Sequence, residues 1–267
     1  MIKKKITTKV IIEMKKNGEK IAVLTAYDFL LAKLLDEAGI DIILVGDSLG
    51  NVVQGNDTTI SVTLDEIIYH TKIVRKAVKR AMVVADMPFL SYQVSTEEAV
   101  RNCGRVLKET NVEAVKLEGG EQIVETISRL TSIGIPVMGH IGLTPQSVHQ
   151  FGGYHLQGKE KRDAEKILND AKLLEQAGCF SLVLEKIPAT LAESISQSLS
   201  IPTIGIGAGA QCDGQVLVVY DMLGMFDDFT PKFARKYLHL SSEIKNAFLQ
   251  YTDDVKKGKF PNEKESF

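Results

Sequence analysis

Short runs of apolar residues, many of them β-branched, recur along the chain and are separated by segments with helical spacing. Continuous apolar runs without alternation are typical of strands that are covered on both faces, as in parallel sheets. These runs predict strands at residues 21–24, 42–45, 82–85, 114–115, 137–138, 182–184, 203–204 and 216–219.

Between most of these strands the apolar residues follow the period of an amphipathic helix. The first such face, at i, i+3, i+4 and i+7, consists of Leu31, Leu34, Leu35 and Ala38. Gly39 follows in the position of a left-handed C-cap. Two further helices are predicted to begin at capping boxes, residues 63–66 and 95–98. Strand and helix therefore alternate along the chain.

This alternation occurs about eight times, and no polar linker or Pro/Gly-rich seam divides the chain. Repeated βα units predict a parallel sheet, and eight of them in about 250 residues favour closure into a (β/α)8 TIM barrel. We expect a single barrel domain over residues 1–267, with a short N-terminal helix and a polar C-terminal tail. The alternative is an open, doubly wound sheet. Residues 205–210 match the dinucleotide pattern G-x-G-x-x-G/A, but no helical pattern follows them, which favours a sharp loop at a strand end.

The composition, charge and cysteine content restrict the classes of protein to which this chain can belong. Hydrophobic residues make up 44% and charged residues 25%, as in ordinary globular proteins. The net charge of −2 gives no indication of a nucleic-acid or membrane partner, and no apolar run approaches the ~18 residues of a membrane span. The three cysteines, Cys103, Cys179 and Cys212, are widely spaced, which predicts reduced thiols in a cytoplasmic protein.

Ionisable residues follow or end five successive predicted strands. They are Asp47, Asp86, Glu118, His140 and Glu185, with Lys116 two residues before Glu118 on the same side of its strand. In a barrel these strand ends meet at one rim, where catalytic loops begin. A single carboxylate after a strand is most often a turn or cap residue, and His140 by itself could be structural or a ligand contact. Five in succession favour a functional site.

Carboxylates brought close together repel one another, so such a cluster requires a cation, shared protons or hydrogen-bond donors. Oxygen ligands select a hard ion, most often Mg²⁺. Asp47, Asp86 and Glu118 come from three successive strands and are therefore the predicted metal ligands. Lys116 beside them is suited to bind an anionic substrate.

Several motifs resemble the ketopantoate hydroxymethyltransferase family (3-methyl-2-oxobutanoate hydroxymethyltransferase). They are Thr25-Ala-Tyr-Asp28, Val45-Gly-Asp-Ser-Leu-Gly50, Ala85-Asp-Met-Pro-Phe89, Val115-Lys-Leu-Glu-Gly-Gly120, Gly139-His-Ile-Gly-Leu-Thr-Pro-Gln-Ser147, Phe151-Gly-Gly-Tyr154 and Gly205-Ile-Gly-Ala-Gly209. The likeness runs from about residue 20 to 236, in the family's order and near its spacing.

The resemblance implies a Mg²⁺-dependent barrel of the phosphoenolpyruvate/pyruvate-binding superfamily. It also implies transfer of a hydroxymethyl group from 5,10-methylenetetrahydrofolate to 3-methyl-2-oxobutanoate, which gives 2-dehydropantoate for pantothenate biosynthesis through a Mg-stabilised enolate. By motif, the metal residues are Asp47, Asp86 and Glu118, and the keto-acid contacts are Asp47, Ser48, Asp86 and Lys116. Glu185 matches the proton acceptor, and His140 matches a further active-site position. Family members assemble as homodecamers, which implies an oligomer here.

Two alternatives stay open at this point. One is a keto-acid carbon–carbon lyase or mutase of the same superfamily. The other is a barrel without catalytic activity that binds a metabolite. A free base at Glu185 argues against the second.

Overall fold

The structure is a computed structural model that describes residues 5–226 and 231–267. It divides into two compact units, residues 1–218 and 219–267. The expectation of a single domain over residues 1–267 stays a prediction.

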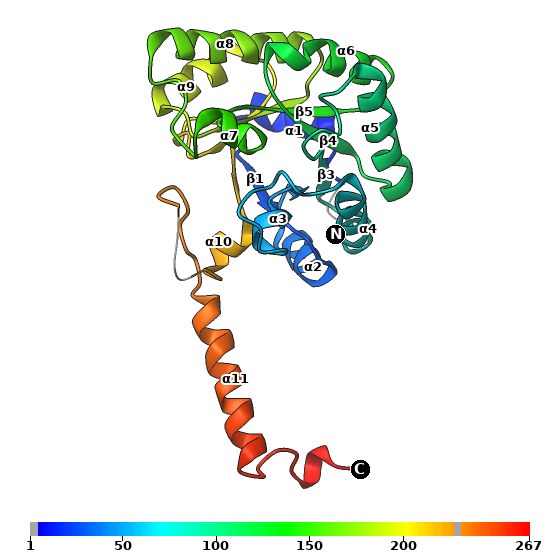
Figure 1. Ribbon diagram of the computed structural model, residues 1–267, viewed down its shortest axis with the longest axis vertical. Helices are drawn as coiled ribbons and strands as arrows, with labels where there is room; N and C mark the ends of the chain where they lie inside the picture. The colour runs from blue at the N-terminus through cyan, green and yellow to red at the C-terminus, as the bar shows by residue number, and fades with distance from the viewer. Residues whose placement is uncertain (1–4, 227–230) are drawn as a thin grey trace. The chain divides into compact units, whose positions relative to one another are not determined.

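Over the described part of the first unit, eight parallel strands pair in chain order and close into a barrel, with β8 pairing to β1 through Ile21 and Gly214 (Figure 1). The strands are β1 (Ile21–Thr25), β2 (Ile42–Val45), β3 (Met82–Asp86), β4 (Ala114–Glu118), β5 (Val137–Gly142), β6 (Ser181–Glu185), β7 (Thr203–Ile206) and β8 (Gly214–Leu217). The predicted (β/α)8 barrel is confirmed, and the open sheet is excluded.

The helices of this unit lie between the strands in the sequence and around them in space (Figure 1). They are α1 (Thr8–Lys16), α2 (Phe29–Ala38), α3 (Leu49–Val52), α4 (Leu64–Ala77), α5 (Thr96–Thr110), α6 (Val124–Ser132), α7 (Val148–Phe151), α8 (Lys161–Gln176) and α9 (Ala189–Ser198), with the short 3-10 helices η1 (Glu121–Ile123) and η2 (Pro145–Ser147). The predicted N-terminal helix is α1.

The local signals at the helix ends are confirmed at Thr63 and Gly39, and in part at residues 95–98, where only the Ser95 half of the predicted capping box forms. Thr63 and Glu66 form a reciprocal capping box at the start of α4, and Ser95 accepts from the N–H of Glu98 at the start of α5. Gly39 ends α2 in the left-handed region, with φ 91°.

The predicted apolar face of α2 is wrong in part. Leu34 is 60% exposed, and the buried residues of this helix are Ala32 and Leu35. The helix packs beside α4, and this neighbour determines which side faces the protein. The periodicity of a helix in which most positions are apolar does not fix that side.

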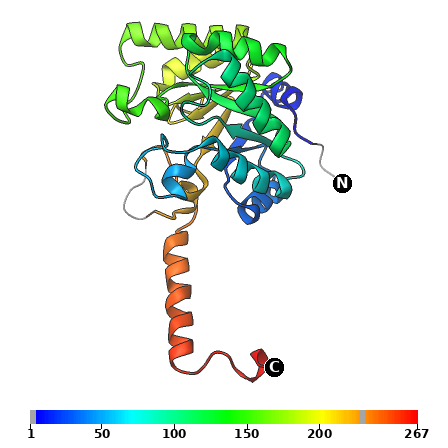
Figure 2. The same cartoon turned by 45° about the vertical axis from the view of Figure 1, so that its right-hand side comes forward.

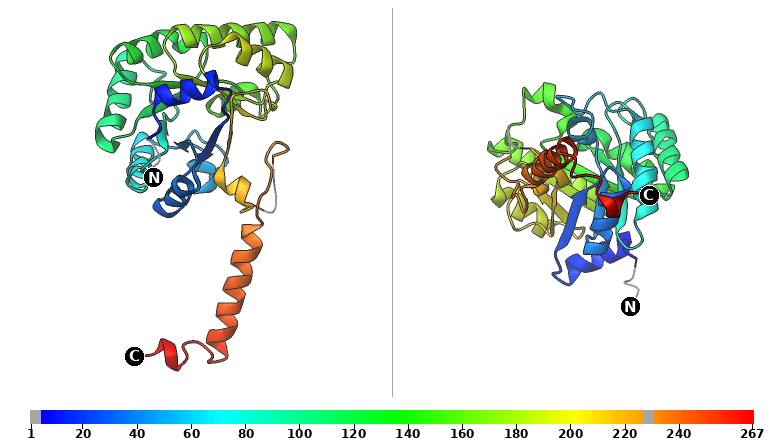
Figure 3. Two further views of the ribbon diagram at one scale, coloured as in Figure 1. Left: turned by 180° about the vertical axis from the view of Figure 1, so that it is seen from behind. Right: turned by 90° about the horizontal axis from the view of Figure 1, so that it is seen from below.

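The barrel interior is an apolar core that α1 closes at its N-terminal end (Figure 3). Residues from the strands, such as Ile42, Met82 and Ile204, form one buried cluster with Ile6 and Ile11. Apolar side chains therefore fill this end of the barrel, which leaves the opposite rim for polar chemistry.

The predicted loop after β7 is confirmed. Gly207 and Gly209 have φ values of 62° and 85°, and the chain then enters β8 without forming a helix. The three cysteines are free and buried. Among the described helices, none has the length and apolar character needed to cross a membrane.

The second unit contains α10 (Val219–Leu223), α11 (Leu240–Lys256) and the short 3-10 helix η3 (Glu263–Glu265). Figure 2 shows α11 as one continuous helix. None of its residues is buried, and Phe248, Leu249 and Tyr251 are exposed.

Candidate active site

The ionisable residues predicted from the strand ends lie together at the carboxyl-terminal rim of the barrel. Asp86 and Glu185 end β3 and β6, Asp47 follows β2 by two residues, and Lys116 and Glu118 lie on β4. One expectation needs correction, because β5 continues to Gly142 and His140 therefore lies within the strand. The side chains are buried: the exposed fraction is 2–5% for Asp47, Asp86, Lys116, Glu118 and His140, and 15% for the side chain of Glu185.

Lys116 is the central cation of this cluster. Its Nζ lies 2.8 Å from Asp86 Oδ1 and 3.4 Å from Glu118 Oε1. Burial by itself would lower the pKa of Lys116, but the charges of Asp86, Glu118 and Asp47 raise it well above its usual value. Burial by itself would raise the pKa of Glu118, but the neighbouring Lys116 and His140 lower it to about 2. The ammonium and the Glu118 carboxylate are therefore both charged at neutral pH.

His140 bridges two carboxylates. Its Nδ1 lies 3.4 Å from Glu118 Oε1, and its Nε2 lies 3.3 Å from Glu185 Oε2. Lys116 Nζ is 3.1 Å from the same Nδ1. Burial and Lys116 would lower the pKa of His140, but Glu118 and Glu185 outweigh them and raise it to about 9. The imidazole lies between the carboxylates of Glu118 and Glu185.

Asp47 and Asp86 form a second part of the cluster, in which burial and like charges disfavour the ionised carboxylates. The backbone N–H of Asp47 donates to Asp86 Oδ2 at 3.3 Å, so the two residues lie side by side at the rim. Burial raises the pKa of Asp47 well above its usual value, and the charges of Asp86 and Glu118 raise it further. Burial also raises the pKa of Asp86, although Lys116 opposes this. A second cation would relieve this repulsion.

The donor set fits Mg²⁺, which commonly uses one or two protein carboxylates and completes its octahedron with water and substrate oxygens. Asp47 and Asp86 supply two such carboxylates. Over residues 5–226 and 231–267, no three His, Cys, Asp or Glu side chains are arranged to hold a metal ion by themselves. Glu118, the third predicted ligand, contacts Lys116 and His140. The metal role of all three residues stays a prediction.

Ser48, predicted to contact the substrate, begins the short helix α3 directly after Asp47. Its hydroxyl lies 2.8 Å from the hydroxyl of the buried Tyr27, which follows β1. This contact fixes Ser48 next to the acidic cluster. Its role toward a substrate stays a prediction.

Sequence reasoning missed two buried residues of the site, Gln146 on η2 and Tyr92 in the segment after β3. Gln146 Nε2 donates to Asp47 Oδ2 at 2.9 Å, and its backbone N–H donates to Glu118 Oε2 at 3.1 Å. The hydroxyl of Tyr92 accepts from the N–H of Glu118 at 3.0 Å. A polar residue just beyond a barrel strand was the available signal for Gln146, whereas nothing in the sequence distinguished Tyr92.

The backbone around Glu185 is unusually tight. Its carbonyl accepts from the N–H of Leu143 at 2.8 Å, and a Cβ added to Gly142 would lie 2.3 Å from that oxygen. Gly142 has φ 93°, and Lys186 also adopts a left-handed conformation, with φ 46°. The β5 and β6 ends thus meet in a geometry that requires glycine at position 142.

Gly142→Ala is expected to slow any reaction that depends on Glu185, by roughly tenfold to a hundredfold, since a shift of about 1 Å at a reacting group can have that cost. Exchange of the C3 proton of a keto acid with solvent deuterium measures this. Gly134→Ala is the matched control, because Gly134 has φ 90° and no heavy atom within 4 Å of an added Cβ. Equal slowing in both variants would assign the effect to backbone strain instead.

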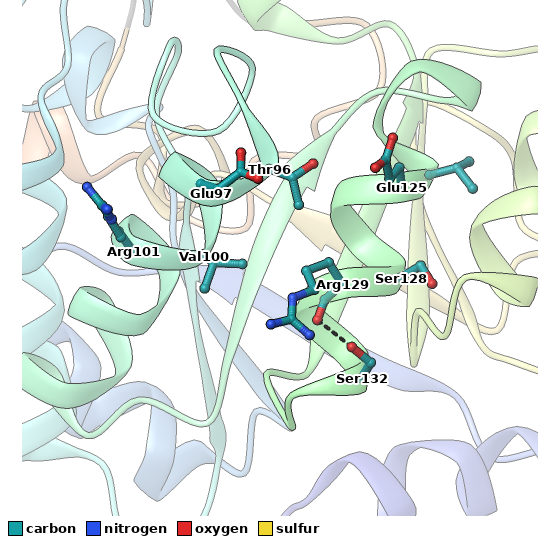
Figure 4. A pocket seen from close by; sticks show the side chains of 9 residues that line it. Thr96, Glu97, Val100, Arg101, Glu125, Ser128, Arg129 and Ser132 are labelled. Atoms are coloured by element: carbon teal, nitrogen blue, oxygen red, sulfur yellow. Dashed lines mark hydrogen bonds between the residues drawn. The ribbon is translucent and has the colours of Figure 1, made fainter.

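A groove of about 810 Å³ lies elsewhere, between α5 and α6 (Figure 4). Its lining includes Arg101 and Arg129 and none of the predicted site residues. The groove is therefore separate from the predicted site.

Comparison with known proteins identifies close relatives. The sequence model of the ketopantoate hydroxymethyltransferase family matches residues 5–263. The 3-methyl-2-oxobutanoate hydroxymethyltransferase of Syntrophus aciditrophicus (strain SB) is 58% identical over 264 residues, which cover 99% of this chain and 97% of the relative. The protein of the same name from Porphyromonas gingivalis (strain W83) is 57% identical with the same coverage.

Solved structures share the fold at much lower identity. A 2,3-dimethylmalate lyase of the PEP mutase/isocitrate lyase superfamily has a TM-score of 0.60 and 17% identity, covering 96% of this chain and 89% of that one. A phosphonopyruvate hydrolase in complex with oxalate and Mg²⁺ has a TM-score of 0.63 and 11% identity, covering 97% and 93%. These likenesses support the barrel fold alone, whereas the relatives above 50% identity bear on the reaction.

Proposed function

We propose that the buried cluster at the barrel rim is the active site of this chain, which belongs to the ketopantoate hydroxymethyltransferase family and transfers a hydroxymethyl group to 3-methyl-2-oxobutanoate. In this proposal 5,10-methylenetetrahydrofolate is the one-carbon donor and Mg²⁺ is the cofactor. The main support is the separation of roles among the carboxylates. The backbone N–H of Asp47 donates to the carboxylate of Asp86, and Glu118 contacts Lys116 and His140. Glu185 has the most exposed carboxylate of the cluster.

The keto acid is bound through its carboxylate and the neighbouring ketone oxygen. Lys116 provides a fixed positive charge for this anion, because Asp86 and Glu118 keep its ammonium protonated. Ser48 offers a hydroxyl beside the same point. Buried charge-assisted hydrogen bonds of this kind orient a small anion strongly.

Asp47 and Asp86 would hold Mg²⁺, with Glu118 beside them as the family resemblance implies. When bound, Mg²⁺ supplies a Lewis-acid charge that polarises the ketone and makes the adjacent C–H more acidic. A structural neighbour, the phosphonopyruvate hydrolase, was crystallised with oxalate and Mg²⁺. Oxalate also presents two oxygens on adjacent carbons, so this pairing supports the proposal.

Glu185 removes the C3 proton of the keto acid. Its carboxylate comes from β6, across the rim from Asp47 and Asp86 on the β2 and β3 side, so it can reach the carbon without binding the metal. His140 Nε2, 3.3 Å from Glu185 Oε2, holds this carboxylate in position. A base that a neighbour holds in position within reach of the proton is what general base catalysis requires.

The carbon that has lost its proton then forms a bond to the methylene carbon of the folate. Both bonds between this methylene carbon and the folate nitrogens break, and water supplies the hydroxyl group. The C3 proton and the remaining proton of the water go to the two nitrogens, so the products are 2-dehydropantoate and tetrahydrofolate. Tyr154, in the segment after α7, is 45% exposed, and its pKa is raised first by burial and then by the charges of Glu185, Asp47 and Glu118.

The proposal also includes the cellular compartment and the oligomeric state. Free, buried cysteines support a reducing compartment such as the cytoplasm. The family resemblance implies a homo-oligomer, and exposed apolar side chains such as Leu30 on α2 and Phe248 on α11 support association between copies.

One incubation tests the reaction. The protein with Mg²⁺, 3-methyl-2-oxobutanoate and 5,10-methylenetetrahydrofolate should yield 2-dehydropantoate and tetrahydrofolate in equal amounts, and removing Mg²⁺ with EDTA should stop it. Folate-independent cleavage of a hydroxy diacid would instead favour the lyase or mutase alternative. Binding of the keto acid without proton exchange would favour a barrel that is not catalytic.

A further inference from the structure

Gln146 is a neutral residue whose side chain uses all of its hydrogen-bonding capacity inside the site. It is 4% exposed. Its Nε2 donates to Asp47 Oδ2 and to the carbonyl of Met87, both at 2.9 Å. Its Oε1 accepts from the hydroxyl of Tyr92 at 2.8 Å and from Gln93 Nε2 at 3.0 Å.

These four partners leave the amide one orientation. Two acceptors, Asp47 Oδ2 and the carbonyl of Met87, face Nε2, so rotating the amide by 180° would bring its oxygen against both of them. Such a fully satisfied buried network is rigid, because each lost bond would leave a polar atom unpaired. Gln146 therefore presents its N–H to Asp47 in a fixed direction.

Gln146 also contacts the second part of the cluster. Its backbone N–H donates to Glu118 Oε2 at 3.1 Å, while the other oxygen of Glu118 is near Lys116 and His140. The hydroxyl of Tyr92 joins this arrangement, since it lies 3.0 Å from Glu118 N and 2.9 Å from Glu118 O. One residue on η2 thus links the ends of β2 and β4 and the segment after β3.

We propose that Gln146 is a positioning residue that orients the carboxylate of Asp47, and with it the cation site. It holds Asp47 by Oδ2 and so leaves the other oxygen for a cation. Its backbone N–H holds Glu118 by Oε2 in the same way, which leaves Oε1 for Lys116 and His140. This inference rests on the proposed function in one respect, the binding of Mg²⁺ by Asp47.

The test is the affinity for Mg²⁺ alone, measured by calorimetry without substrates. Gln146→Met keeps the length of the side chain, adds no charge and removes all four side-chain hydrogen bonds. We expect the Kd for Mg²⁺ to rise roughly tenfold to a hundredfold, as is usual when the partner of a metal ligand is removed. In the assay, the Mg²⁺ concentration for half-maximal rate should rise in parallel, whereas kcat at saturating Mg²⁺ should fall much less.

A purely structural role would give a different result. Partial misfolding would lower the number of sites at an unchanged Kd, and that outcome would overturn the proposal. Gln197→Met is the control, because Gln197 is exposed on α9 and its side-chain amide donates to Glu193 on the same helix, away from the site. The Kd of this variant for Mg²⁺ should equal that of the unmodified protein. Tyr92→Phe provides a milder variant, since Gln93 still fixes Oε1, and it should raise the Kd by a smaller factor.

Asp47→Asn separates the two hypotheses. If it raises the Kd for Mg²⁺ and Gln146→Met does not, Gln146 has no positioning role although the proposed metal site stands. If Asp47→Asn leaves the Kd unchanged, the placement of Mg²⁺ at Asp47 is itself wrong, and the inference about Gln146 is overturned with it.

Discussion

Glu185→Gln is expected to abolish exchange of the C3 proton of 3-methyl-2-oxobutanoate with solvent deuterium, while the protein still binds Mg²⁺ and the keto acid. The amide is nearly the same size as the carboxylate, so it can occupy the same place beside His140 Nε2, which lies 3.3 Å from Glu185 Oε2 in the native chain. It cannot take up a proton at neutral pH. Losing a general base typically lowers a rate by about 10²–10⁴-fold, so exchange followed by NMR should fall below detection over hours.

The control for this variant is Glu165→Gln, because Glu165 is exposed on α8 and carries the same change of charge. It should exchange the proton at the unmodified rate. Calorimetry with Mg²⁺ and the keto acid establishes that the Glu185→Gln site is intact. Exchange at the unmodified rate in Glu185→Gln would assign the base to another group.

Lys116→Met should destabilise the protein in the absence of Mg²⁺ by about 3–5 kcal/mol, the usual cost of removing one partner from a buried ion pair. The variant leaves Asp86 and Glu118 without the ammonium that lies 2.8 Å and 3.4 Å from them. Urea denaturation in EDTA measures the free energy of unfolding. Added Mg²⁺ should restore part of the loss, because a cation at Asp47 and Asp86 replaces some of the missing charge.

Lys15→Met is the matched control for Lys116→Met. Lys15 Nζ lies 2.9 Å from Asp213 Oδ2, and α1, which carries it, packs at the end of the barrel remote from the site. Its loss should lower stability without any recovery by Mg²⁺. Recovery of the same size in both variants would show that Mg²⁺ acts on the protein generally. Keto-acid affinity should fall about tenfold or more only in Lys116→Met, since Lys116 is the proposed partner of the substrate carboxylate.

The fold could be predicted because its signals are local. Strands such as β2 and β3 are apolar at consecutive positions, which is the pattern of a strand covered on both faces, and Thr63 and Gly39 mark helix ends by their own backbone chemistry. The buried side of α2 was not predictable to the same degree, because it depends on the packing of α4 and not on the period of α2.

The carboxylates of the site were predictable for a topological reason. Parallel strands of a barrel all end at one rim. The alternation of strands and helices therefore predicts that Asp47, Asp86 and Glu185 lie at the same rim. Side chains two positions apart lie on the same side of a strand, which predicted that Lys116 and Glu118 are neighbours on β4. The 3.4 Å separation of their charged atoms confirms this.

The sequence by itself thus determined the barrel and the identity of the charged groups at its rim, because strand period and strand direction follow from neighbouring residues. Only the tertiary structure decided which groups touch. Gln146 reaches Asp47 across 99 positions of the chain, and Tyr92 reaches Glu118 across 26, through segments whose paths depend on the assembled barrel. Hydrogen bonds between such segments have no sequence period, since they depend on where side chains lie after packing and not on their spacing along the chain.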